Sequence, residues 1–278
     1  MNLKNLLSCS TIRLLLVAGA SCLLVQSANA TLLFSEGFGY TSGTGLPGSI
    51  NPGNSTAWGN GNSAALSIGS GNLTYSGLQD LGGNDLVINN GTASSSINTY
   101  ANQTAGQVYY SFLFNPTAVD SANNFITALN PGTASPNGGS DAIDAYYYAD
   151  GHIRIRANAQ SASAGTGPVL TLGTTYLVVE EIDLTAKTAS LWVDPDSSTF
   201  GGTAPTATAT LSGITATAVD NVGFKAQSAA GGPYSIDNVL IGTTWADVTP
   251  AAVPEPSTFA LAGAGLGIMF MMIRRRRS

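Results

Sequence analysis

Residues able to carry out chemistry are scarce in the central part of this chain, between residues 31 and 250. The sequence holds one histidine, His152, and its two cysteines, Cys9 and Cys22, both precede that region. A single histidine without cysteine supports neither a histidine-based catalytic triad nor a histidine-rich metal site, and no disulfide can form. His152 also follows a hairpin-turn signal, where an exposed polar residue is expected. We therefore predict no catalytic residue.

Acidic side chains in predicted turns are the remaining candidates for holding an ion. Calcium takes several oxygen ligands from carboxylates and carbonyls. The acids in such turns are Glu36, Asp141, Asp144, Asp194, Asp196 and Asp237. The sequence has neither an EF-hand loop nor an Asp-rich nonapeptide, so ordinary turn-capping and surface acids are the alternative to a structural calcium ion.

Aromatic residues could contact a sugar, because a ring offers an apolar face while its polar edge stays hydrated. Trp192 alternates with Leu191 and Val193 along one predicted strand, so it lies on the opposite face from them. If those two residues face the core, Trp192 faces outward and is a candidate glycan contact. Trp58, in a Gly/Asn/Ser loop, is another. Tryptophans covered by neighbouring loops are the alternative.

Between residues 31 and 250 the pattern predicts strands and no long amphipathic helix. Short runs rich in Val, Ile, Tyr, Phe and Thr alternate with clusters of Gly, Asn, Pro and Ser. Thirteen such runs predict an all-β fold, a two-sheet antiparallel jelly-roll sandwich. The predicted strands are Leu32–Phe34, Ala65–Ile68, Leu73–Tyr75, Leu86–Ile88, Gln107–Phe114, Asn124–Ala128, Ile143–Tyr148, His152–Ala157, Thr175–Leu184, Ala189–Asp194, Thr206–Leu211, Asn221–Ala226 and Tyr234–Ile241.

One hairpin can be assigned a register. Asp150-Gly151 is a strong signal for a two-residue turn. Such a turn would pair Tyr148 with Ile153 on the core side, and Tyr147 would face outward beside Arg154. A cation–π contact is then available between them. Tyr147 and Arg154 are therefore further candidates for contacting a glycan.

Several segments resemble strands of concanavalin A-like (laminin G-like) sandwiches, namely Thr175–Leu184, Thr188–Pro195 and Tyr234–Gly242. The resemblance rests on strand patterns and supports a jelly-roll domain over residues 31–250. Carbohydrate-binding jelly rolls often fasten the first strand to the last with a structural calcium ion. Glu36 and Asp237 occupy comparable positions here, so the resemblance implies a calcium site at these two carboxylates.

The same resemblance bears on hydrolysis. Glycosidases on this fold carry the pattern Glu-x-Asp-x-x-Glu along one strand. Glu181 and Asp183 match the first two acids, but Ala186 stands where the third belongs. Retaining hydrolysis requires an acid/base and a nucleophile roughly 5 Å apart, so one working group is missing. The sequence argues against an enzyme, and a divergent glycoside hydrolase remains the second alternative.

The first 30 residues are predicted to be a signal peptide. Lys4 and Arg13 supply a positive region, an apolar stretch follows, and Ala28 and Ala30 form a small-x-small cleavage site. We expect the exported chain to start at Thr31.

The last segment, residues 251–278, combines a motif, an apolar run from Ser257 to Ile273 and a basic end. The motif is Pro254, Glu255 and Pro256, and the basic end is Arg274, Arg275, Arg276 and Arg277. As a transmembrane helix of about 25 Å, the run is just long enough to cross a thin bilayer, and the arginines would hold the terminus in the cytoplasm. This arrangement resembles the PEP-CTERM sorting signal, whose tail is removed by a membrane exosortase that passes the protein to the cell surface. An ordinary tail anchor is the alternative.

Charge excludes nucleic acid as a partner. Six of the ten basic residues lie in the two predicted processed ends, so residues 31–253 carry four basic and fifteen acidic side chains, a net charge of −11. A surface of this sign repels nucleic acid at long range.

These features together predict an exported protein that is anchored in the inner membrane as a precursor and then moved to the cell surface. The leading hypothesis is a structural or adhesive component of the extracellular (biofilm) matrix without catalytic activity. The alternative is a carbohydrate-binding module for an extracellular polysaccharide, with Tyr147, Arg154 or Trp192 at the ligand surface. No cofactor is predicted beyond the structural calcium ion.

Overall fold

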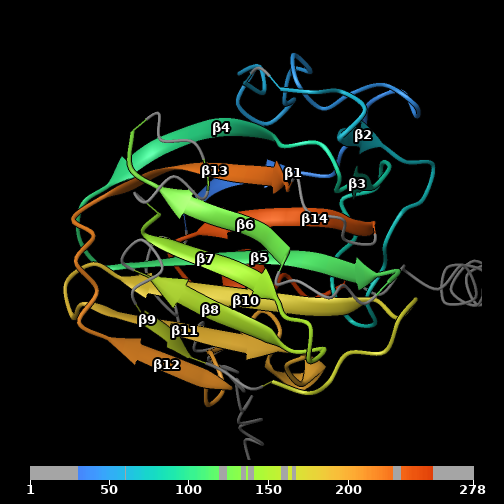
Figure 1. Cartoon of the computed structure of the whole chain (residues 1–278). Coiled ribbons are helices and arrows are strands. Elements are labelled where there is room, and N and C mark those ends of the chain that lie inside the picture. The colour runs from blue at the N-terminus through green and yellow to red at the C-terminus, as the bar shows by residue number, and fades with distance from the viewer. Residues whose placement is uncertain are drawn as a thin grey trace, which may run out of the picture.

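Strands are the main regular structure of the described chain, and they form two antiparallel sheets that lie face to face (Figure 1). This computed structural model describes residues 31–252 except 60, 119–123, 133–135, 137–140, 158–161, 165–166 and 228–232. The predicted signal peptide at residues 1–30 and the predicted tail from residue 253 onward lie outside the described residues. Among the described residues, no helix is long and apolar enough to cross a membrane.

The eight-stranded sheet has the order β12-β11-β10-β5-β14-β3-β2, and β1 pairs with β14. Its strands are β1 Leu32–Glu36, β2 Leu66–Ile68, β3 Leu86–Ile88, β5 Gln107–Pro116, β10 Tyr176–Asp183, β11 Thr188–Val193, β12 Ala209–Ser212 and β14 Tyr234–Gly242. The six-stranded sheet has the order β4-β13-β6-β7-β8-β9. Its strands are β4 Ser94–Gln103, β6 Asn124–Asn130, β7 Ile143–Tyr147, β8 Ile153–Ala157, β9 Ala162–Ala164 and β13 Val219–Ala226.

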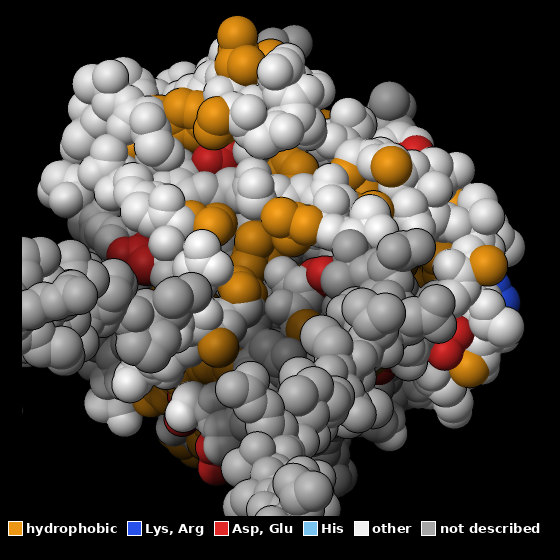
Figure 2. Space-filling model, turned by 180° about the vertical axis from the view of Figure 1, so that it is seen from behind, with side chains coloured by type: hydrophobic (Ala, Val, Ile, Leu, Met, Phe, Trp, Pro, Cys, Tyr) orange, Lys and Arg blue, Asp and Glu red, His pale blue; other side chains and the backbone are white. Residues whose placement is uncertain are grey.

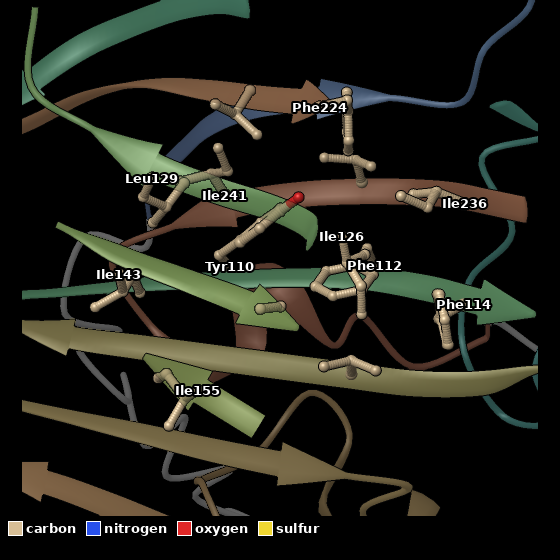
Figure 3. Close-up of a cluster of buried hydrophobic side chains, with 14 of the residues drawn as sticks. Tyr110, Phe112, Phe114, Ile126, Leu129, Ile143, Ile155, Phe224, Ile236 and Ile241 are labelled. Atoms are coloured by element: carbon tan, nitrogen blue, oxygen red, sulfur yellow. The ribbon is translucent and has the colours of Figure 1, made fainter. Parts of the chain in front are cut away.

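The main core lies between the two sheets, and strand alternation fills it. Tyr110, Phe112 and Phe114 on β5 point into this core, while Tyr109 and Leu113 on the same strand point to the other face. Figure 3 shows such side chains from both sheets gathered between the ribbons. Burial of this apolar area is the main term that stabilises the fold.

A second apolar cluster covers the outer face of the eight-stranded sheet. Its largest members include Tyr109, Trp192, Phe200 and Trp245. The short helix α1, Trp245–Val248, contributes Trp245 and begins with a capping box between Thr244 and Asp247. The chain then stays attached to the body as far as residue 252, because the Ala252 amide donates to the carbonyl of Gly77 at 2.9 Å.

The all-β sandwich expected from the sequence is confirmed, and most predicted strands appear within a few residues of their expected ends. Leu73–Tyr75 is not a strand. The sequence analysis did not predict β4, β9 or α1. The buried side of β4 includes Ser96 and Asn98, which bond to the carbonyls of Gly59 and Thr56. A strand that satisfies polar side chains in this way lacks the apolar alternation by which strands are recognised.

The predicted register of the β7–β8 hairpin is wrong by one residue. Tyr147 pairs with Ile153 and Tyr146 with Arg154. The loop holds three residues rather than two, because the Tyr148 amide donates to the carbonyl of His152 at 2.9 Å. Only Gly151 in this loop has a positive φ, of 83°, as in a type I turn followed by a left-handed glycine. Tyr147 therefore points into the core instead of outward.

Candidate functional site

The outer face of the six-stranded sheet carries two stacked arginine–tyrosine pairs. The Arg156 guanidinium lies 3.6 Å from the centre of the Tyr146 ring, and that of Arg154 lies 4.1 Å from the centre of the Tyr148 ring. Phe125 meets the Tyr146 ring edge to face at 5.4 Å between centroids. The hairpin positions these side chains, because alternation along β7 and β8 sends the intervening residues into the core.

Positive charge gathers on this face. Lys225 on β13 also lies there, because Phe224 and Ala226 on either side of it belong to the core. Three of the four basic residues between 31 and 252 thus share one sheet face. Figure 2 shows the opposite side of the molecule, where the coloured surface carries scattered acidic groups and basic ones only at its edge.

Polar residues continue across the same face from Arg156. Asp144 lies directly opposite Arg156, and Asn130 directly opposite Asn221. We call these four residues the polar row. The pKa of Asp144 is raised to about 7, mainly by burial. The Asp141 carboxyl also raises this pKa, whereas the Arg156 side chain, whose Nε lies 3.3 Å from Asp144 Oδ1, lowers it. The Asp144 carboxyl thus keeps its proton to a higher pH than an ordinary aspartate does.

A polar groove lies on the other side of the sandwich. It has a volume of about 580 Å³ and is lined by Thr74, Tyr75, Ser76, Thr175, Asp194, Pro195, Asp196 and Ser197. Tyr75 is partly exposed and donates its hydroxyl to the exposed Asp194. Asp196 accepts from the Ser198 amide at 2.8 Å, and this bond lowers the pKa of Asp196. The groove joins one aromatic ring to two carboxylates and several hydroxyl groups.

Glu36 lies inside a shell of hydrogen-bond donors. Three side chains donate to Oε2 of Glu36: the Trp58 indole at 2.9 Å, the Asn51 side-chain amide at 2.8 Å and the Tyr40 hydroxyl at 2.5 Å. The Phe38 amide donates to Oε1 at 2.7 Å. The carboxylate therefore fastens the loop that follows β1. Trp58, a candidate glycan contact from the sequence, is buried here as one of these donors.

Asp237 is held separately from Glu36. Its Oδ2 accepts from the Leu73 amide at 2.9 Å and its Oδ1 from the Asn238 amide at 2.7 Å. Burial raises the pKa of Asp237 to about 8, although both bonds lower it, and the charges of Asp85 and Asp80 raise it further. Across the described residues, no group of three or more His, Cys, Asp or Glu is placed to hold a metal ion. Calcium at Glu36 and Asp237 stays a prediction.

The other candidate glycan contacts are placed differently from expectation. Tyr147 is 1% exposed, so the prediction that it faces outward is wrong. Trp192 does face away from Leu191 and Val193, but it is 4% exposed and donates to the carbonyl of Pro205 at 2.9 Å. Arg154 lies on the outer face, as predicted, and pairs with Asp150. Loops that cover the outer face of the eight-stranded sheet account for the burial of Trp192.

The acids of the incomplete glycosidase pattern have local partners. Glu181 lies on the outer face of its sheet, and its Oε1 accepts a hydrogen bond from the side-chain amide of Gln107 at 2.7 Å. Asp183 accepts from the amides of Thr185 and Ala186 in the turn that follows β10. Glu180, which directly precedes Glu181, faces the inter-sheet core, where burial holds the pKa of its carboxyl well above the usual range.

Residues 252–277 match a family model described as the PEP-CTERM protein-sorting motif. The chain carries a PEP-CTERM sorting signal. This match confirms the resemblance drawn from the Pro-Glu-Pro motif, the apolar run and the terminal arginines. No curated protein matches the sequence.

Solved structures similar to this chain include sialidases and a lectin. A protein described as a sialidase has a TM-score of 0.49 at 12% identity, covering 77% of this chain and 18% of its own. Trypanosoma rangeli sialidase has a TM-score of 0.45 at 12% identity, with 81% and 32% covered. Lectin II from Ulex europaeus has a TM-score of 0.42 at 13% identity, with 76% and 98% covered. This chain spans less than a third of the length of these sialidase chains.

Sequence reasoning missed most of the polar row and the groove. Asn130 and Asn221 come from strands far apart in the sequence, and Tyr75 was assigned to a strand that does not form. The sequence signals that point to this face are the run of three tyrosines at 146–148 and the two arginines at alternate positions, Arg154 and Arg156. A three-residue turn would have placed Tyr146 and Tyr148 with the arginines.

Proposed function

We propose that this protein is processed by an exosortase and acts on the cell surface as a structural or adhesive matrix component without catalytic activity. The sorting motif at residues 252–277 carries this proposal, because it marks a protein that is exported and sorted outside the cell. The body ends at the motif, where residue 252 is still hydrogen-bonded to the sandwich.

The absence of catalysis is supported by what the acidic residues do. Glu181 accepts a hydrogen bond from the Gln107 side chain on β5, Asp183 accepts from the amides of the turn that follows β10, and Ala186 replaces the third acid of the pattern. Hydrolysis with retention needs two free carboxyl groups roughly 5 Å apart across the glycosidic bond. If the protein nevertheless releases reducing ends from a polysaccharide, and Glu181→Gln abolishes that release, the non-catalytic proposal fails.

Processing is tested by replacing Pro254, Glu255 and Pro256 with alanine in the producing cell. We expect the variant to stay in the inner membrane with its tail attached, detected by fractionation and by the intact mass of the protein. A matched triple replacement of Thr243, Thr244 and Thr249 by serine leaves the motif intact and should be sorted normally. Surface delivery of a trimmed alanine variant would contradict exosortase processing.

A second candidate function is carbohydrate binding at the groove. The partly exposed ring of Tyr75, beside Asp194 and Asp196, supports it, because sugars stack on aromatic rings and donate hydroxyls to carboxylates. Electrophoresis through gels containing the cell's own polysaccharide would measure it. We expect retardation that Tyr75→Ala removes and that Asp80→Asn, outside the groove, leaves unchanged. Equal mobility with and without the polysaccharide would exclude this function.

A further inference from the structure

The chain leaves the folded body through a short antiparallel pairing. Residues 250–252, which we call the C-terminal strap, lie beside residues 77–79 of a loop that precedes β3. Two backbone hydrogen bonds hold the strap, one on each side of a bridge between Leu78 and Ala251. They run from the Gln79 amide to the Pro250 carbonyl at 2.8 Å and from the Ala252 amide to the Gly77 carbonyl at 2.9 Å.

The residue before the strap is fixed much more firmly than the strap itself. Thr249 is fully buried, its hydroxyl donates to the Trp245 carbonyl at 2.8 Å, and its own carbonyl accepts from the Gly201 amide at 2.7 Å. In the strap, the first residue is half-buried and the other two are exposed. Detaching the strap therefore breaks two hydrogen bonds and uncovers little apolar surface. A segment held in this way can open locally while the rest of the body stays folded.

The sorting motif begins inside the strap. The matched motif covers residues 252–277, so its first residue is the one whose amide bonds to Gly77. One residue separates the strap from Pro254, and the apolar run starts at Ser257. The five residues from 253 to 257 span at most about 18 Å when fully extended. While the strap is attached, the body therefore lies within about that distance of the start of the apolar run.

A protease that removes the tail has to reach a peptide bond close to the body. Proteolysis requires a segment free of folded structure, and its rate follows the population of the opened form when opening is fast compared with cleavage. The attached strap keeps the backbone groups of residues 250 and 252 occupied and leaves a single residue before the motif. Detaching it adds three residues, or about 10 Å, of free chain.

We propose that the C-terminal strap controls processing, because it must detach from residues 77–79 before the exosortase can cut. This inference rests on the proposed exosortase processing and adds the step that sets its rate. The strap's partner belongs to the folded body, since Leu78 is buried in the apolar cluster on the outer face of the eight-stranded sheet. The strap therefore forms only once the body has folded, and it then slows the removal of the tail.

A disulfide across the strap tests this control. Leu78 and Ala251 are a non-hydrogen-bonded pair, whose Cα atoms lie about 4.5 Å apart, within the range that a disulfide spans. No cysteine follows Cys22 in the sequence, so a chain carrying both Leu78→Cys and Ala251→Cys has only this pair after the leader. Pulse-chase labelling of the full chain in the producing cell measures trimming. We expect the oxidised double variant to be trimmed at least tenfold more slowly than the wild type, and dithiothreitol to restore the rate.

The controls separate the bond from the substitutions. Ala251→Cys alone cannot close the disulfide and should be trimmed as the wild type is. A loosened strap should give the opposite change. Gln79→Pro removes the amide that bonds to Pro250 and should speed trimming at least twofold, whereas Gln79→Ala keeps that amide and should leave the rate unchanged.

Trimming of the double variant at the wild-type rate, with its disulfide confirmed by intact mass, overturns the proposal. Equal rates for the two Gln79 variants also overturn it, and this comparison decides alone if the disulfide does not form. Failure of the strap differs from failure of exosortase processing. In the first case, the variant with Pro254, Glu255 and Pro256 replaced by alanine still keeps its tail, and in the second that variant is trimmed as well.

Discussion

Arg156 stacks on Tyr146, which is not the residue directly opposite it. The directly opposed residue is Asp144, and Arg156 leans diagonally along β7 to bring its guanidinium 3.6 Å from the centre of the Tyr146 ring. Arg154 leans in the same direction onto Tyr148. Each arginine therefore touches both an acid and a ring, which explains how two cations lie side by side on one strand.

The two arginines differ in burial, and this predicts different effects of removing them. Arg156→Met leaves the buried Asp144 without its cation and should cost about 3 kcal/mol at pH 8. Arg154→Met breaks a partly exposed pair with Asp150 and should cost under about 1 kcal/mol. Urea denaturation measures both. The loss for Arg156→Met should shrink at pH 5, because Asp144 is then protonated, and a loss independent of pH would contradict this account.

The observed hairpin register predicts which tyrosine matters for stability. Tyr147 is buried in the main core, so Tyr147→Ala should cost about 3 kcal/mol or more in the free energy of unfolding. Tyr148→Ala, on the outer face and partly exposed, should cost about 1 kcal/mol through its lost contact with Arg154. The reverse order would restore the register expected from a two-residue turn.

The donors around Glu36 predict a large effect of a small change. Glu36→Gln replaces one carboxylate oxygen with an NH₂ group that faces the donors of Trp58, Asn51 or Phe38, and should cost about 2 kcal/mol or more. Thermal melting measures the loss. Wild-type melting should be the same in EDTA as in calcium chloride if hydrogen bonds alone hold Glu36. A lower melting temperature in EDTA would support the calcium site predicted at Glu36 and Asp237.

Stability should fall as the pH rises from about 4 to above 8. Asp237 has a folded pKa of about 8 against an ordinary 3.8. A raised folded pKa gives stability that is complete below the unfolded value and is lost as the pH passes the folded value. Asp144, with a pKa of about 7, adds a loss of the same sign.

Asp237→Asn is the variant that checks this. It keeps an acceptor oxygen near the amides of Leu73 and Asn238 but cannot ionise. Its melting temperature should therefore depend less on pH between 5 and 9 than that of the wild type. A wild type that is more stable at pH 9 than at pH 5 would mean that a cation holds Asp237 in its charged form.

The sheets were predictable from the sequence because apolar alternation is a local property. The runs at Gln107–Phe114 and Tyr234–Ile241 coincide with β5 and β14 almost residue for residue. The side-chain faces of β7 were not predictable, because they depend on a single residue of loop length. Because the loop is one residue longer than expected, Tyr147 faces the core, and its neighbours Tyr146 and Tyr148 face outward.

The candidate site was predictable only in part. Arg154 was identified with the correct face, but Trp192 was expected to be open although loops from distant parts of the sequence cover it. Unmet polar groups such as those of Asn130, which lack a hydrogen bond within the described part of the chain, cannot be seen in a sequence, since they become visible only when each donor and acceptor has been assigned a partner.

The outermost strands of both sheets affect how copies of the protein can associate when they are packed densely. Unpaired strand edges invite neighbouring copies to add on and form fibres. Here β2, β9 and β12 are only three or four residues long. The long outermost strand β4 is rich in Ser, Asn and Thr, and Gly59 occupies part of its free side through a bond to the Ile97 carbonyl at 2.8 Å. Molecules packed densely on a cell can therefore touch without polymerising into continuous sheets.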